Sequence, residues 1–142
     1  MYGRVQDVAA LIGRVGVGVV FLAHGLDKWN MGVSGVSHMT EGLGIPLPTL
    51  TAIFLIVVET IGAVAFMVGF ALPVLAVAYA VDMIGAIFFV HIDKGLTGQG
   101  GYEEVLLLAA AAIALGFNGG RLSLDHFLFW RPRAKKRELA TA

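Results

Sequence analysis

The chain has 142 residues and a formal net charge of zero; 58% of its residues are hydrophobic, whereas only 14% are charged. Soluble domains carry about a quarter charged residues, and a soluble protein this small could not bury so much apolar surface. A lipid bilayer accepts that surface directly, so the composition predicts a membrane protein of one domain. The absence of cysteine excludes disulfides, thiolate metal sites and thiol redox chemistry within the chain.

Four apolar segments approach the roughly 20 residues that a helix needs to cross the hydrocarbon core. They cover residues 8–26, 48–70, 73–92 and 102–118. The apolar core of the last one, residues 105–117, is short and needs its flanks to reach full length. Pro73 suits the first turn of the third helix, where a missing N–H is harmless. The sequence therefore predicts an all-α fold, with a four-helix transmembrane bundle in residues 1–130 and a basic tail in residues 131–142.

Positive charge is unevenly placed along the chain. Five of the ten basic residues fall in residues 131–137 and Arg4 precedes the first span, whereas the loops at 29–47 and 93–101 contribute only Lys94. Because Lys and Arg accumulate on the cytoplasmic side of a membrane, we expect a multi-pass plasma-membrane protein with both termini in the cytoplasm.

Two segments outside the spans are also apolar. Apolar residues recur at helical spacing between Trp29 and Ile45, which predicts a short re-entrant or surface helix in the outer loop. The stretch at 122–130 is rich in Leu and Phe, which predicts an interfacial segment whose basic tail meets anionic lipid. A plain topology signal is the alternative interpretation of that tail.

Three charged residues, Arg14, Glu59 and Asp82, interrupt the apolar spans. A charge within the membrane is costly unless it is paired, hydrated or neutralised, so each is a candidate functional residue. The first two spans run antiparallel, and we expect an Arg14–Glu59 ion pair that either locks the bundle or forms part of a site. Asp82 is either a neutral partner in a polar cluster or a site of proton uptake, because burial favours the protonated acid.

Each residue of an α-helix is rotated by ~100° from the one before it, so residues three or four apart lie on the same face of the first span. This face carries Arg14, Gly18, Phe21, Gly25 and Lys28. Two glycines in that row predict the close approach of another helix.

Further polar residues gather at the predicted outer ends of the spans, and we expect a ligand site there. His24 and Lys28 lie one turn apart, His91 closes the third span, and Glu103 and Glu104 open the fourth. A histidine can donate to a quinone carbonyl and changes protonation near neutral pH, so a quinone site and a proton-exchanging mouth both fit. Two facing histidines could also ligate haem, although the lack of a tight ligand spacing disfavours haem and any metal. A hydrogen-bond cluster that orders the outer loops remains the structural alternative.

The chain contains no nucleotide-binding loop, zinc motif or nucleophile elbow. No self-contained catalytic motif is therefore present, and nothing indicates a nucleic-acid partner.

Four motifs occur in order over nearly the whole chain. They are Arg14-Val15-Gly16 with Phe21-Leu22-Ala23-His24-Gly25-Leu26-Asp27-Lys28; Glu59-Thr60-Ile61-Gly62; Met83 to His91 with Gly95 and Gly100-Gly101-Tyr102-Glu103; and Gly119-Gly120-Arg121-Leu122-Ser123-Leu124-Asp125. No motif is specific alone, but together they resemble the spans and loops of the DoxX family.

The resemblance implies a four-helix membrane protein associated with respiratory or sulfur-linked oxidoreductases. That family is named after a subunit of a thiosulfate:quinone oxidoreductase, and other members are tied to redox-stress assemblies. Most members have no assigned activity, so function transfers poorly. The resemblance gives Asp82 no family role, and the missing cysteines argue against a thiol relay.

We therefore expect a DoxX-like integral subunit of a respiratory or redox-stress oxidoreductase complex, near a quinone. One alternative is a small transporter or proton-conducting protein that uses Arg14, Glu59 and Asp82. A second is a purely structural accessory subunit. The expected partners are the lipid bilayer and other membrane or respiratory-complex subunits, and homo-oligomerisation is left open.

Overall fold

The computed structural model describes residues 2–130. Within them every regular element is helical and no strand occurs, which confirms the all-α class. The basic tail expected at 131–142 lies outside the described residues.

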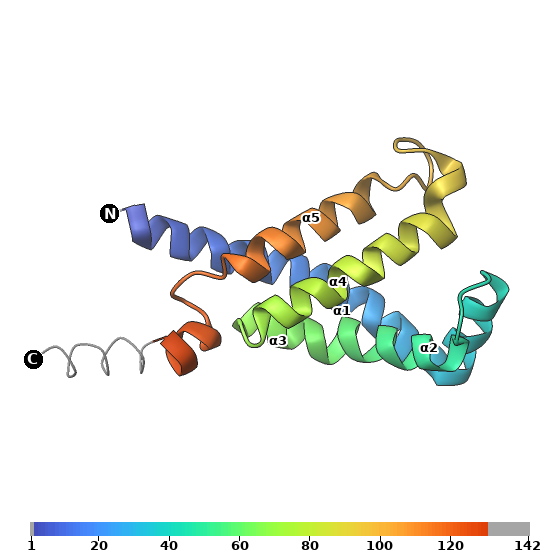
Figure 1. Cartoon of the computed structure of the whole chain (residues 1–142), viewed down its shortest axis with the longest axis horizontal. Coiled ribbons are helices and arrows are strands. Elements are labelled where there is room, and N and C mark those ends of the chain that lie inside the picture. The colour runs from blue at the N-terminus through green and yellow to red at the C-terminus, as the bar shows by residue number, and fades with distance from the viewer. Residues whose placement is uncertain (1, 131–142) are drawn as a thin grey trace, which may run out of the picture.

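Helix α1 (Tyr2–Gly42) runs the length of the molecule (Figure 1). Its 41 residues are interrupted at Gly32, where φ is 72° and ψ is 167°, a left-handed value of φ that glycine adopts without steric cost. Beyond this kink the chain turns back onto the next helix, and Val36 packs against Ala52 and Ile56. The helix expected in the outer loop is thus formed, as a continuation of the first helix.

The second helical segment runs from Pro48 to Val68 and packs against α1. It consists of α2 (Pro48–Val57), a π-helical turn η1 (Val58–Gly62) and α3 (Ala63–Val68). It ends at Gly69, whose φ of 80° begins the turn that leads into the third helical segment.

The third segment consists of α4 (Leu72–Ala86), the π-helical turn η2 (Ile87–His91) and the 3₁₀ turn η3 (Ile92–Lys94). A loop then leads into α5 (Glu103–Phe117), which packs closely on α4 (Figure 1). A Cβ on Gly116 would overlap the Ala76 side chain, so glycine permits this close approach.

The segment after α5 returns to the start of α4 and ends in the π-helical turn η4 (His126–Trp130). Both carboxylate oxygens of Asp125 accept hydrogen bonds there, from the backbone amides of Ala71 and Leu72, each at 2.8 Å. They satisfy amides at the start of α4 that have no partner within the helix. The start of α1 and η4 lie at one end of the molecule, and the loops 43–47 and 95–102 lie at the other (Figure 1).

Three helices in the described part of the chain are long and apolar enough to cross a membrane. They are Gly3–Gly42, Pro48–Val68 and Leu72–Lys94. The fourth predicted span is helical, but α5 has 15 residues, fewer than the roughly 20 that the hydrocarbon core requires. Large apolar side chains are exposed on the outer face of α4 at helical spacing, among them Val74, Val77, Val81 and Ile84. Such a face suits lipid rather than water.

Candidate functional site

The two glycines on the buried face of α1 allow the second helical segment to approach. A Cβ on Gly25 would overlap the backbone carbonyl of Glu59, and one on Gly18 would overlap the side chain of Met67. Both glycines are buried. The predicted close approach is therefore confirmed, and it places Gly25 directly against the π-helical turn η1.

Lys28 lies one turn beyond Gly25 on the same face of α1 and pairs with Glu59. The Nζ–Oε2 distance is 2.5 Å, and the side chains are 18% and 3% exposed, respectively. Glu59 belongs to η1, and π-helical turns are frequently found at functional sites. The expected Arg14–Glu59 pair was wrong, because the helices meet at Gly25 and this contact brings Glu59 level with Lys28.

Arg14 is fully buried at the other end of the bundle. Its Nη2 donates to the backbone carbonyl of Leu122, while Nε and Nη1 find no hydrogen-bond partner among residues 2–130. A Cβ on Gly69 would overlap the guanidinium, so glycine leaves the room that it occupies. The Arg14 site, made of Arg14, Gly69 and Leu122, joins α1 to the turn before α4 and to the segment after α5.

An aromatic stack separates the Arg14 site from the Lys28–Glu59 pair. The rings of Phe21 and Tyr79 are stacked with centroids 3.8 Å apart, and Phe66 meets Tyr79 edge-on at 5.4 Å. The Tyr79 hydroxyl donates to the Val58 carbonyl of η1 at 3.1 Å. The stack divides the polar interior into two centres.

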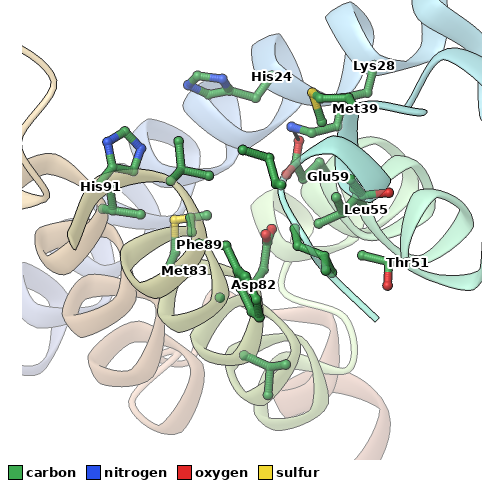
Figure 2. Close-up of a pocket in the computed structure, with 18 of the residues that line it drawn as sticks. His24, Lys28, Met39, Thr51, Leu55, Glu59, Asp82, Met83, Phe89 and His91 are labelled. Atoms are coloured by element: carbon green, nitrogen blue, oxygen red, sulfur yellow. Dashed lines mark hydrogen bonds and ion pairs between the residues drawn. The ribbon is translucent and has the colours of Figure 1, made fainter. Parts of the chain in front are cut away.

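A cavity of about 980 Å³ lies on the Lys28 side of this stack. We name it the Lys28 cavity. It is lined by every residue predicted as a site candidate except Arg14, namely His24, Lys28, Glu59, Asp82, His91, Glu103 and Glu104. Figure 2 shows five of them, His24, Lys28, Glu59, Asp82 and His91, on α1, η1, α4 and η2, together with apolar side chains such as Leu55 and Phe89. Arg14 is the predicted residue that the cavity excludes.

Asp82 contributes a second carboxyl to this cavity. It lies on α4, is 8% exposed and points toward the cavity (Figure 2). Its Oδ2 is buried and has no hydrogen-bond partner in the described part of the chain. The Asp82 carboxyl interacts electrostatically with Glu59 and with Lys28. One amine and two carboxyl groups therefore form a polar floor under walls that are mostly apolar.

The two histidines lie on different walls of the cavity (Figure 2). His91 uses Nδ1 to hydrogen-bond the Gly100 carbonyl at 2.7 Å, which leaves Nε2 free to face a ligand. His24 makes no hydrogen bond within residues 2–130, and neither histidine forms an ion pair there with Glu103 or Glu104. No group of three metal-ligating side chains occurs in that same range.

Sequence reasoning missed two parts of the cavity. Residues of the segment after the Gly32 kink, among them Met39 and Leu43, line one wall, and nothing in their spacing indicated where that segment would fold. The Lys28–Glu59 pair could have been found, because Lys28 follows Gly25 on the face already identified for close helix contact.

Comparison with known proteins places the chain in a family. A family model described as DoxX matches residues 9–92. A Bacillus subtilis (strain 168) protein named "Putative oxidoreductase CatD" is 33% identical over 124 residues, covering 87% of this chain and 89% of that protein. An Escherichia coli (strain K12) protein named "Inner membrane protein YphA" is 30% identical over 131 residues, covering 87% and 93%. No solved structure matches the chain. The resemblance seen in the motifs is confirmed, and this chain is a membrane protein that belongs to the DoxX family.

Proposed function

We propose that this chain is an integral subunit of a membrane oxidoreductase assembly and that the Lys28 cavity binds an amphipathic ligand of the quinone type. The observation that carries the proposal is the cavity itself. Its volume of about 980 Å³ falls within the roughly 300–1,000 Å³ of small-molecule sites. Its apolar walls and few convergent polar groups are typical of such sites. One similar protein carries "oxidoreductase" in its name.

The lining residues suit a quinone. Such a ligand presents two carbonyl acceptors on a flat ring and carries an apolar tail. His24 and His91 lie on different walls, and Leu55 and Phe89 offer apolar surface. A ring N–H of His24 can donate to a quinone carbonyl, whereas the Nδ1–H of His91 is committed to the Gly100 carbonyl and leaves Nε2 to accept from a quinol hydroxyl. When bound, a quinone would supply two-electron carrier chemistry; the chain itself supplies a histidine on each of two walls and excludes water from the ring.

The same proposal includes the topology. α5 with its flanking residues is the fourth span, residues 1–130 form one transmembrane domain, and both termini are cytoplasmic because of the basic residues at 131–137. The Lys28 cavity then opens toward the outer side. The chain lacks cysteine, so single cysteines at Thr97 and Thr141 give a clean test. An impermeant maleimide should label Thr97→Cys in intact cells and leave Thr141→Cys unlabelled, and the reverse pattern refutes this orientation.

Ligand binding is tested on the purified protein in lipid nanodiscs, with a short-chain ubiquinone analogue as the probe and calorimetry as the measurement. His24→Ala and His91→Ala should each weaken binding about tenfold, since a hydrogen bond contributes about 0.5–1.5 kcal/mol. His38→Ala is the matched control, because the His38 side chain is 79% exposed and does not line the cavity. A wild-type protein that binds no analogue, or an equal loss in the control, overturns the ligand site.

The assembly is tested separately. Affinity purification from native membranes in mild detergent should recover oxidoreductase subunits with the tagged chain, identified by mass spectrometry. A chain that purifies alone under conditions that preserve known respiratory complexes contradicts the subunit role.

The alternative of a proton conductor that uses all three intramembrane charges is less well supported. The Phe21–Tyr79–Phe66 stack lies between the Arg14 site and the Glu59–Asp82 pair, so no polar route joins them among the described residues. A quinone site needs no such route, and the Lys28 cavity lies on one side of the stack.

A further inference from the structure

We propose that Glu59 and Asp82 share one exchangeable proton at the floor of the Lys28 cavity, so that Lys28, Glu59 and Asp82 together form a proton-binding site. This inference deepens the proposed function, since it concerns the same cavity. Its primary test needs no ligand.

The charges of Lys28, Glu59 and Asp82 do not balance when all three groups are ionised. An ionised Lys28 beside two ionised carboxylates would leave one net negative charge among groups that are largely buried: the Lys28 and Glu59 side chains are 18% and 3% exposed, and residue Asp82 is 8% exposed. An uncompensated charge in such surroundings is strongly unfavourable, and two carboxylates that share a site cannot readily both ionise. One added proton makes the three groups neutral.

The carboxyl groups of Glu59 and Asp82 differ in the contacts that their oxygens make. The Lys28 ammonium donates a hydrogen bond to Oε2 of Glu59, so the positive charge faces that carboxyl group. Asp82 lines the same cavity from α4, within electrostatic range of Glu59, and its Oδ2 is buried without a partner in residues 2–130. An ionised Asp82 would leave a charged oxygen unsatisfied there, whereas a protonated acid leaves a neutral one.

The other titratable groups around the cavity do not add a second fixed positive charge. The other titratable groups that line the cavity are His24 and Asp27 on α1, His91 on η2, and Glu103 and Glu104 on α5. All of these except His91, which is partly buried, are exposed. Three are carboxylates, and Lys28 is the only lysine or arginine among the described residues that line the cavity, so it alone offers a fixed positive charge to the pair.

The cavity gives water access to the shared proton. Glu59 and Asp82 both line the cavity, so their proton can exchange with water that enters it. On the opposite side, Tyr79 stacks on Phe21 and commits its hydroxyl to the Val58 carbonyl. The proton therefore exchanges from the cavity side alone, which suits a site that gives or takes protons together with a bound ligand.

The test is infrared spectroscopy of the ligand-free full-length protein in nanodiscs at neutral pH. The wild type should show the C=O stretch of one protonated carboxylic acid, and that band should shift in D₂O because the proton exchanges. Asp82→Asn and Glu59→Gln should each abolish the band, since either leaves one carboxylate to balance Lys28. Lys28→Met should double it, because two protons are then needed for neutrality.

Glu41→Gln is the matched control, since the Glu41 side chain is 69% exposed and does not line the cavity. It should leave the band unchanged. A wild-type spectrum without the band, or a band that survives both carboxyl substitutions, overturns the shared proton even if one variant fails to fold. A band present in a protein that binds no quinone analogue refutes the ligand proposal alone, whereas binding without a band refutes this inference alone.

Discussion

Arg14 and Lys28 occupy the same face of α1 about four helical turns apart, yet their surroundings differ in kind. Arg14 is fully buried, donates to a backbone carbonyl and lies outside the Lys28 cavity. Lys28 pairs with a carboxylate at the floor of that cavity, beside a second acid. A charge within an apolar span is therefore not by itself a functional site. The partners of each charge distinguish a cation that fastens the fold from one that belongs to a site.

The contrast has a physical basis in what each cation holds together. The guanidinium has five N–H donors in a rigid fork, and it connects α1 with a segment more than one hundred residues away in sequence. The ammonium of Lys28 is a compact point charge on a flexible stem, which suits a site where charge must be balanced against two carboxyl groups. We therefore infer that Arg14 is a structural clamp and that Lys28 is part of the site.

The largest expected effect concerns the space around Arg14. Gly69→Ala would place a Cβ against the guanidinium and Ser123 at a φ of 80°. Strain at positive φ costs about 1–3 kcal/mol and overpacking about 1–3 kcal/mol more, so unfolding of the purified protein should become easier by about 3 kcal/mol or more. Gly44→Ala is the control, because its φ is 73° with nothing within 4 Å of a Cβ in the described structure.

Gly44→Ala should show the strain cost alone. Adding Arg14→Ala to Gly69→Ala should recover part of the loss, because the clash is removed. Equal losses at the two glycines would show that Arg14 does not fill the space beside Gly69, and the clamp would have to be abandoned.

The next largest effect concerns the cation that pairs with Glu59. Glu59→Gln and Lys28→Met should each destabilise the protein by about 1.5–3 kcal/mol, since each removes a hydrogen bond between charged groups. The double variant should lose less than the sum by about 1 kcal/mol or more, because contacting residues couple. Chemical unfolding in detergent micelles measures all three free energies.

The matched cycle pairs Glu59→Gln with Arg14→Met. Those two losses should add within about 0.5 kcal/mol, since residues without a shared contact act independently. Strong coupling in this cycle together with additivity in the Lys28 cycle would restore the Arg14–Glu59 pair and reverse the comparison.

The smallest effect concerns the helix contact that sets the level of Lys28. Gly25→Ala would overlap the Glu59 carbonyl and should cost about 1–3 kcal/mol as α1 moves away. It should also weaken binding of the quinone analogue, because Lys28 and Glu59 separate. Gly16→Ala on the exposed face of α1 meets nothing within 4 Å in the described structure, and should stabilise the helix by about 0.5–1 kcal/mol. Identical outcomes for both glycines would remove Gly25 from the account of the site.

Much of this arrangement follows from local sequence. Apolar runs of membrane length, the turn at Gly69, Pro73 in the first turn of α4 and the glycine face of α1 are set by composition and by a period of about 3.6 residues. The same period, with the antiparallel order of the spans, brought His24, His91 and Glu103 to one end of the bundle. Residues on one face of one helix are neighbours whatever the rest of the fold does, so a sequence can specify them.

What the tertiary structure alone decided is the pairing of charges between helices. Glu59 meets Lys28 and not Arg14 because Gly25 contacts the backbone of Glu59, and the π-helical turn η1 alters the local register of the second segment. Likewise, Leu122 becomes the partner of Arg14 only because Asp125 ties the final segment to the start of α4. Sequence periodicity specifies which face a residue occupies, but the level at which two helices meet depends on packing between residues far apart in the chain.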